Sequence, residues 1–367
     1  MTRRKSIINE IISMAITVGT LIALVLVANA NYGAALGEVI LYFICGAIVV
    51  GFLCTLFHEA GHIIAGKRNG FALLSVSVWF FKWVKENGRT VFHFTFLGEE
   101  AGATEMAARS TENLSVRLKK MTYGGLIATF IPMMLGVVPF FLTGYLPVYA
   151  FIGLGMFLPI GAYVFFGNAL PTYSGGAGND GKLIYDLKTY NDDAKVALSM
   201  IAVQSELFNG KTPAEIDAKY YDDLPQLAEN DLNFLILLSA RLDRFVDLKD
   251  FGNAKKTLDR LKSVTEYYPK SVETVVALNE LYAACTYDKN FSRADEIVED
   301  FAKYLDKHNG SLEIRAKLAY ILYVKGEREH FDVFYRKGVK EANKLNLRGQ
   351  GIFERKLLEE MKKDFER

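Results

Sequence analysis

The chain has few cysteines and few histidines for its length. Its three cysteines, among 367 residues, are Cys45, Cys54 and Cys285. Neither a disulfide framework nor a C-x-x-C zinc pattern can be drawn from them, so we expect small buried hydrophobic side chains. Of the five histidines, two stand four residues apart, at His58 and His62.

An excess of charge of either sign is also lacking. The 43 basic residues nearly balance the 42 acidic ones, which leaves a formal net charge of +1. Proteins that bind nucleic acid usually present a strongly basic surface, so this balance argues against nucleic acid as a partner. The apolar residues are unevenly spread, because most of the first 170 positions are apolar and roughly the last 180 are rich in charge. A boundary is therefore expected near residue 185.

Long apolar runs predict four membrane-spanning helices, since about 20 apolar residues cross a bilayer. The runs cover residues 11–30, 39–66, 121–146 and 148–170. Loops rich in basic residues usually lie on the cytoplasmic side of a membrane. Basic residues gather at one end of the runs, which is therefore expected to be the cytoplasmic end: Arg3, Arg4, Lys5, Lys67, Arg68, Arg109, Arg117, Lys119 and Lys120. We expect a multi-pass protein of a bacterial cytoplasmic membrane with both termini in the cytoplasm.

Two features of these runs bear on their helices. The first run ends in Ala28-Asn29-Ala30, which resembles a signal-peptidase site, so a cleaved signal peptide is the alternative to a retained helix. In the third run, Pro132 and Pro139 predict kinks. Gly124 and Gly125 predict the close approach of another helix.

The second apolar run contains an H-E-x-x-H pattern, His58-Glu59-Ala60-Gly61-His62. At 3.6 residues per turn, His58 and His62 share one helix face and could hold a zinc ion. Glu59 is placed to take a proton from a metal-activated water and to pass it to a leaving amine. The motif lies on the order of 10 Å inside the cytoplasmic face. Burying ionisable groups at that depth costs free energy, so their presence indicates a function. The alternative is a buried structural pair of histidines.

A catalytic zinc ion usually has three protein ligands and one open position. Asp180, in a glycine-rich turn after the fourth run, is the candidate for the third ligand. The alternative is a solvated turn aspartate. The longer metzincin pattern is absent, because Ala65 and Arg68 occupy its Gly and His positions.

Residues 71–97 predict a small β-hairpin at the cytoplasmic surface. Ser75-Val76-Ser77-Val78 alternates, Asn87-Gly88 is a strong hairpin turn signal, and Phe92-His93-Phe94-Thr95-Phe96 alternates again. The hairpin would either cap the helix ends or hold an extended substrate by strand addition. We expect His93 to be a surface residue of this hairpin.

These motifs together resemble the site-2 protease family of intramembrane zinc metalloproteases, over about residues 36–187. The resemblance rests on His58-Glu59-x-x-His62 in an apolar helix, the hairpin, and Asn168-x-x-Pro171 followed by Asp180-Gly181. It implies one catalytic Zn²⁺ held by His58, His62 and Asp180, with Glu59 as the acid/base. Asn168 is a further candidate catalytic residue that would orient the substrate or polarise the scissile carbonyl. The stretch from Pro171 to Asp180 is longer than the family's usual spacing.

The charged half of the chain contains an internal repeat of 40 residues. Good helix starts recur at Asp231, Ser271 and Ser311, and phenylalanines near the start of a second helix recur at Phe251, Phe291 and Phe331. Small residues match at Ala254 and Ala294. An earlier unit is expected from Asn191, with Thr212-Pro213-Ala214-Glu215 as a capping box, and residues 350–366 read as a terminal capping helix.

This repeat predicts an α-solenoid of helix pairs, which resembles tetratricopeptide repeats in design. Its concave face would suit a cytoplasmic protein or peptide partner. The alternative is a compact regulatory or packing domain.

We therefore expect an α-helical membrane protein in three parts: an N-terminal transmembrane helix (1–35), an intramembrane metalloprotease core (36–187) and a cytoplasmic helical repeat domain (188–367). The expected function is zinc-dependent hydrolysis of peptide bonds in or near the transmembrane segments of membrane-protein substrates, for regulated intramembrane proteolysis or clearance of signal-peptide remnants. A non-proteolytic membrane-anchored scaffold is the main alternative, and the intact Glu59 argues against it. A zinc enzyme acting on a non-peptide substrate is a third.

Overall fold

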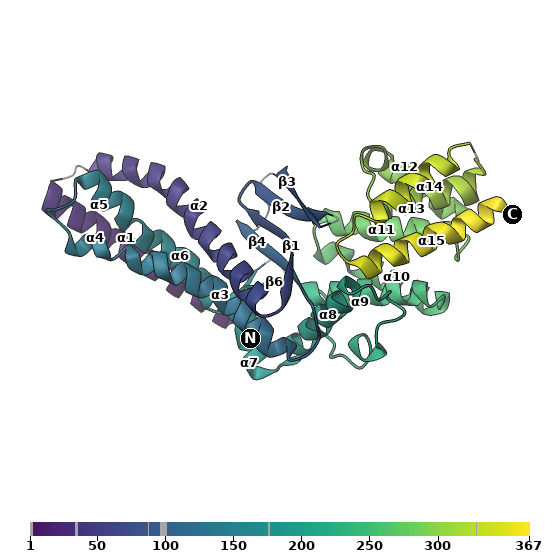
Figure 1. The fold of residues 1–367 in the computed structure, drawn as a ribbon, viewed down its shortest axis with the longest axis horizontal. Helices are drawn as coiled ribbons and strands as arrows, with labels where there is room; N and C mark the ends of the chain where they lie inside the picture. Colours follow the sequence, from purple (N-terminus) through teal and green to yellow (C-terminus); the bar gives the residue numbers. More distant parts are fainter. Residues whose placement is uncertain (1–2, 34–35, 87, 96–100, 175–176, 328) are drawn as a thin grey trace. The chain divides into compact units, whose positions relative to one another are not determined.

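The apolar first half of the sequence folds into long helices and a small sheet, and the charged second half folds into shorter helices (Figure 1). The computed structural model describes residues 3–33, 36–86, 88–95, 101–174, 177–327 and 329–367. It divides into two compact units. The first unit comprises residues 1–85, 90–107 and 112–194, and the second comprises residues 86–89, 108–111 and 195–367.

The first unit is built on helices that run side by side (Figure 1). Their bounds are α1 (Arg3–Tyr32), α2 (Leu36–Arg68), α3 (Leu114–Leu135), α4 (Val138–Phe141), α5 (Val148–Gly155), α6 (Phe157–Ala169) and α7 (Asp180–Thr189). Among the residues that the structure describes, four helical segments are long and apolar enough to cross a membrane: 4–32, 40–68, 114–141 and 148–169. The four candidate spans predicted by the sequence are thus present.

The prolines and cysteines of these helices behave only partly as predicted. Pro132 stays inside α3, which ends three residues later, at Leu135. Pro139 does not kink a continuous helix but stands in the first turn of α4, where its missing N–H has no helical partner to lose. Cys54 and, in the second unit, Cys285 are buried, but the prediction was wrong for Cys45 of α2, which is exposed.

The predicted hairpin is part of a larger sheet, so that prediction was incomplete. Its strands are β1 (Phe71–Val78), β2 (Phe81–Glu86), β3 (Arg89–Phe94) and β4 (Gly102–Ala108), in the order β3-β2-β1-β4. β1 pairs with β2 in an antiparallel register that places Val78 opposite Phe81. Asn87 and Phe96 lie outside the described residues, and His93 is exposed on β3. β4 escaped prediction because its glycine, alanines and glutamate are poor strand formers.

Helix α8 (Asp192–Phe208) begins in the first unit and continues into the second. The other helices of the second unit are α9 (Leu232–Asp247), α10 (Phe251–Val264), α11 (Lys270–Cys285), α12 (Phe291–Lys307), α13 (Ser311–Tyr320), α14 (Phe331–Ala342) and α15 (Arg348–Glu366). Short turns of 3₁₀ or π type lie at η1 (Ala218–Tyr220), η2 (Thr265–Tyr267) and η3 (Ile321–Lys325).

The repeated phenylalanines fall where the sequence pattern places them. Of the three predicted helix-start residues, Asp231 is the N-cap of α9, whereas Ser271 and Ser311 lie inside the first turns of α11 and α13. Phe251, Phe291 and Phe331 are the first residues of α10, α12 and α14. Ala254 and Ala294 are fully buried, at 0% exposure, on α10 and α12, which pack against α9 and α11. The second unit is therefore built from consecutive helix pairs, followed by α15 at the predicted place.

The helix expected after Thr212 does not form, and this prediction was wrong. The Thr212 N–H does donate to the Glu215 carboxylate at 2.8 Å, as in a capping box. Beyond it, however, the backbone groups bond to α9 instead of to a next helical turn. The Ala214 N–H donates to Asp247, and the Arg244 guanidinium donates to the carbonyls of Pro213 and Ile216.

A partly buried carboxyl makes the stability of the second unit depend on pH. Burial raises the pKa of Asp243 on α9 to about 6, with Glu354 and Asp247 adding to the rise and Arg315 and Gln350 opposing it. An aspartate in the unfolded chain titrates near 3.9. The folded state therefore holds the proton more tightly, and the stability that this proton contributes is lost as the pH rises from about 4 through 6.

We expect Asp243→Asn to raise the unfolding temperature of the protein at pH 8 by several degrees, corresponding to at most about 3 kcal/mol. The gain should shrink at pH 5, where the wild-type carboxyl is protonated. Thermal unfolding followed by circular dichroism measures both values, with the exposed Asp259 of α10 changed to Asn as the control. A gain that is equal at pH 5 and pH 8 would contradict the assignment.

Candidate metal centre

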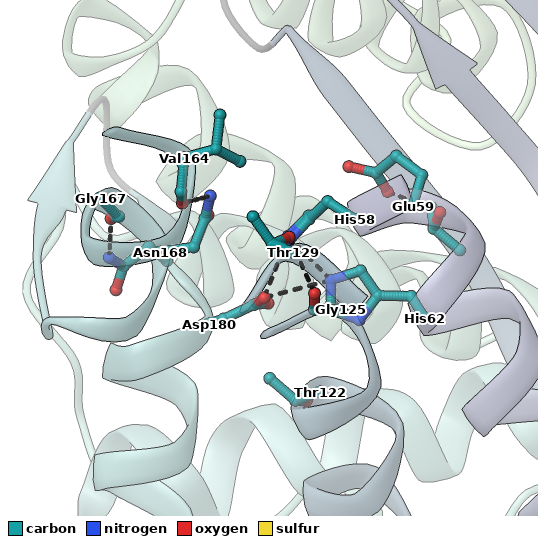
Figure 2. Close-up of polar contacts among 12 residues, drawn as sticks. His58, Glu59, His62, Thr122, Gly125, Thr129, Val164, Gly167, Asn168 and Asp180 are labelled. Atoms are coloured by element: carbon teal, nitrogen blue, oxygen red, sulfur yellow. Dashed lines mark hydrogen bonds and ion pairs between the residues drawn. The ribbon is translucent and has the colours of Figure 1, made fainter. Parts of the chain in front are cut away.

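The two histidines of the H-E-x-x-H pattern meet on one face of α2, as Figure 2 shows. Their Nε2 atoms lie 3.1 Å apart. Both residues are buried, with 5% of His58 and 8% of His62 exposed. The four-residue spacing of a helix thus brings two imidazole nitrogens together, as the sequence predicts.

Each imidazole is oriented through its other ring nitrogen. The Nδ1 atom of His62 faces the carbonyl oxygen of Met121 at 3.2 Å, and a carbonyl only accepts. The Nδ1 atom of His58 lies 2.9 Å from the Thr129 hydroxyl, whose own hydrogen is donated to the carbonyl of Gly125. Both histidines therefore carry a proton on Nδ1, and both Nε2 atoms face the space between them as the candidate ligand atoms.

Asp180 brings a carboxylate to the same point. It is the first residue of α7, and its Oδ2 atom lies 3.2 Å from Nε2 of His58 and 3.1 Å from Nε2 of His62. The three ligand atoms lie within 4.8 Å of one another. Figure 2 shows the aspartate and the two imidazoles converging from α7 and α2.

This arrangement fits a metal ion. Oδ2 of Asp180 is buried without a hydrogen-bond donor, although buried polar atoms are nearly always hydrogen-bonded. When both imidazoles are neutral, their Nε2 lone pairs and the carboxylate oxygen repel one another unless a metal cation lies among them. Ligand atoms of a tetrahedral zinc ion are roughly 3.3 Å apart, given Zn–N and Zn–O distances of about 2.0 Å. The separations of 3.1–3.2 Å here are close to that value.

Glycines allow α3 to pack closely against the histidine face of α2. A Cβ atom added to Gly125 would lie 2.3 Å from Nε2 of His62. Gly61 and Gly124 face each other across the two helices, and a Cβ atom on Gly61 would lie 2.3 Å from the Gly124 carbonyl. The close approach predicted from Gly124 and Gly125 is confirmed, and the partner helix is the one that carries the histidines.

Glu59 leaves α2 in another direction from the two histidines (Figure 2). It is buried, with 5% of its surface exposed. Its Oε2 atom accepts a hydrogen bond of 2.6 Å from the hydroxyl of Thr104 on β4. The Glu59 carboxylate is therefore not among the converging ligand groups. Its hydrogen bond to Thr104 holds it against β4, one residue after the ligand candidate His58 in the sequence.

Asn168 is not directed at the three ligand atoms. Its side-chain amide donates to the carbonyl of Val164, one turn earlier in α6, at 2.9 Å (Figure 2). Such local bonds are an ordinary use of asparagine in a helix. The structure therefore gives Asn168 a contact within α6 and no contact with His58, His62 or Asp180.

Asn179 holds the loop of Asp180, and no sequence motif predicts this role. Its Oδ1 atom accepts from the N–H groups of Thr172 and Lys182, at 3.0 and 2.9 Å. Its amide donates to the carbonyls of Gly167 and Leu170, at 2.6 and 2.7 Å. The available signal was an asparagine at the N-cap position directly before a candidate ligand.

We expect Asn179→Ala to weaken zinc binding by about 10–100-fold, the usual range for residues that support a ligand. Alanine removes all four hydrogen bonds and leaves the end of α6 and the start of α7 unconnected at this point. Competition with a chromophoric chelator measures the affinity. Asn253→Ala, an exposed asparagine of α10, is the control; equal affinities for the two variants would contradict the role of Asn179.

Helix α1 also holds this loop. The amide of Asn9 donates to the Pro171 carbonyl at 2.7 Å, and the Ser6 hydroxyl accepts from the Tyr173 N–H at 2.9 Å. Cleavage after Ala30 would remove both contacts. We therefore expect the intact mass of the purified protein to include residues 3–30. A mass that begins at residue 31 would show that the loop of Asp180 is held without α1.

A buried lysine follows Asp180 in the first turn of α7. Burial opposes the charge of Lys182, but hydrogen bonds to Asp186 and Asp193 outweigh it and raise the pKa of the ammonium group. Lys182 is therefore charged, and its charge is balanced by two carboxylates.

Comparison of the chain with protein-family models, with curated proteins and with solved structures finds no match. A functional assignment therefore rests on the geometry of the site and on the resemblance of its motifs.

Proposed function

We propose that this protein is a zinc-dependent intramembrane endopeptidase of the site-2 protease type. The observation that carries the proposal is the convergence of three buried ligand atoms, from His58, His62 and Asp180, within 4.8 Å of one another. Two histidines and one carboxylate form a common catalytic zinc set, which leaves one position open.

Different residues of the chain have different roles in the proposed reaction. His58, His62 and Asp180 would hold the ion, while Thr129 and the Met121 carbonyl fix the two imidazoles. Zinc, when bound, supplies an activated water and polarises the scissile carbonyl. Glu59 takes the proton of the attacking water and returns it to the leaving amine, which is the role its position next to His58 supports.

The substrate class follows from the surroundings of the motif. The histidines lie in one of four helices that are long and apolar enough to cross a membrane. We propose that these helices span a bacterial cytoplasmic membrane with both termini in the cytoplasm, as the basic residues favour. The substrate is then a transmembrane segment of another membrane protein, unwound at the cleaved bond because helical hydrogen bonds protect the backbone.

The second unit would lie in the cytoplasm in this arrangement. Its consecutive helix pairs support a repeat domain of tetratricopeptide-like design. We propose that it binds a cytoplasmic protein or peptide partner.

The test uses full-length protein purified in detergent and incorporated into lipid vesicles. We expect about one zinc ion per chain. A reporter with a single transmembrane segment should be cleaved in or near that segment, and a zinc chelator should stop cleavage until zinc is restored. Protein that holds no zinc, or cleavage that the chelator does not affect, would overturn the proposal.

A further inference from the structure

Lys182 is unusual because a lysine ammonium is rarely buried. Only 4% of its surface is exposed. Its Nζ atom lies 2.5 Å from a carboxylate oxygen of Asp186 and 2.5 Å from one of Asp193. A buried lysine with two carboxylate partners is held in one place, because leaving its buried charge without them is costly.

The two partners come from different helices. Asp186 lies on α7, one turn after Lys182, whereas Asp193 lies in the first turn of α8. Asn191, between the helices, donates to Asp186 at 2.8 Å and accepts from the Ala194 N–H at 3.0 Å. The corner between α7 and α8 is therefore one connected polar network, with Lys182 at its centre.

On its other side, Lys182 contacts the residues that place Asp180. Its N–H group donates to Oδ1 of Asn179 at 2.9 Å. Its aliphatic part lies against Gly178, where an added Cβ atom would be 2.5 Å from Cγ of Lys182. Its ammonium lies 5.7 Å from the centre of the Tyr173 ring. Asp180 is thus fixed between Asn179 and Lys182 in the first turn of α7.

We propose that Lys182 is a positioning residue that couples the start of α8 to the metal ligand Asp180. Helix α8 continues past residue 194 into the second unit. A force that shifts its first turn displaces Asp193, and the buried ammonium of Lys182 must follow or lose one of its two carboxylate partners. The first turn of α7 moves with Lys182, and the Asp180 carboxylate moves relative to the two histidines.

This coupling makes the metal centre sensitive to what the second unit binds. It rests on the proposed function, because it requires that His58, His62 and Asp180 hold a metal ion. If the ion pairs served stability alone, breaking the contact to α8 would lower the unfolding temperature and leave the bound metal unchanged. The two roles therefore predict different spectra for the bound metal.

The experiment compares full-length Asp193→Asn with the wild type, using Co²⁺ as the probe. In Asp193→Asn, Lys182 keeps Asp186, so only the charged contact to α8 is weakened. We expect about tenfold weaker Co²⁺ binding, as for other residues that support a ligand, and shifted visible bands of the bound ion. Asp192→Asn, an exposed neighbour on the same helix, should bind Co²⁺ like the wild type.

The outcomes separate the two proposals. Wild-type protein that binds no Co²⁺ or Zn²⁺ overturns the proposed function. Wild-type protein that binds Co²⁺, together with an Asp193→Asn variant of equal affinity and identical spectrum, overturns the coupling alone. If Asp193→Asn does not fold, Asp193→Glu keeps the charge and lengthens the side chain by one methylene. An altered Co²⁺ spectrum is then expected, and an unaltered one overturns the coupling.

Discussion

Replacing Glu59 by glutamine is expected to lower the rate of substrate cleavage by about 10²–10⁴-fold, the usual contribution of a general acid–base group. Glutamine has nearly the same shape but cannot take a proton from water and return it. Zinc content should not change, because the three converging ligand atoms belong to His58, His62 and Asp180. The hydroxyl of Thr104 can donate to the glutamine oxygen as it does to the carboxylate.

The measurement is a cleavage rate and a zinc determination on the same preparation of reconstituted protein. Glu105→Gln is the matched control, because Glu105 lies next to Thr104 on β4 and accepts from the hydroxyl of Ser75 at a solvent-exposed position. We expect this control to cleave at the wild-type rate. Full activity of Glu59→Gln would instead favour a zinc enzyme with another base. If neither the wild type nor the variant cleaves, a scaffold is favoured.

The position of Glu59 beneath β4 was not accessible from the sequence. A Cβ atom added to Gly102 would lie 2.6 Å from Oε1 of Glu59, so the strand passes directly over the carboxylate. The strand has no alternating apolar pattern, and its pairing with β1 joins segments about 30 residues apart in the chain. Sequence patterns report local periods well, but a contact of this kind depends on a fold that brings distant segments together.

The predictions that were confirmed depend on short-range spacing. The four-residue step of a helix is enough to bring His58 and His62 together, and the 40-residue repeat locates Phe251, Phe291 and Phe331 at helix starts. The predictions that failed concern backbone groups for which hydrogen-bond partners distant in the sequence compete with local ones. The capping-box sequence at Thr212 offers a helix start, but side chains of α9 bond to the backbone that the helix would need.

Asn179 and Asn168 show the same limit at the metal centre. Asn168 stands in the sequence pattern of the resembled family, yet its amide bonds within its own helix. Asn179, which no motif marks, makes four hydrogen bonds that join the end of α6 to the start of α7. Which residue orients a loop depends on where backbone carbonyl and N–H groups without helical partners come together. That position is known only from the three-dimensional structure.

Replacing Gly125 by alanine is expected to remove zinc from the protein, with a loss of affinity at least as large as the 10–100-fold typical of an altered supporting residue. The new Cβ atom would lie 2.3 Å from Nε2 and 2.4 Å from Cε1 of His62. Carbon atoms in contact are about 3.5–4.0 Å apart, so the imidazole must rotate away or α3 must withdraw. Either movement displaces one of three ligand atoms, and substrate cleavage should fall with the zinc content.

Gly19→Ala is the control for this substitution, since a Cβ atom at Gly19 of α1 would meet no atom within 4 Å. Alanine also favours a helix over glycine, so this variant should keep its zinc and its activity. Circular dichroism of Gly125→Ala should retain the helical signal, which separates loss of the metal from loss of the fold. Wild-type zinc affinity in Gly125→Ala would mean that His62 is not a ligand in the orientation described, and the metal centre would then have to be built from other groups.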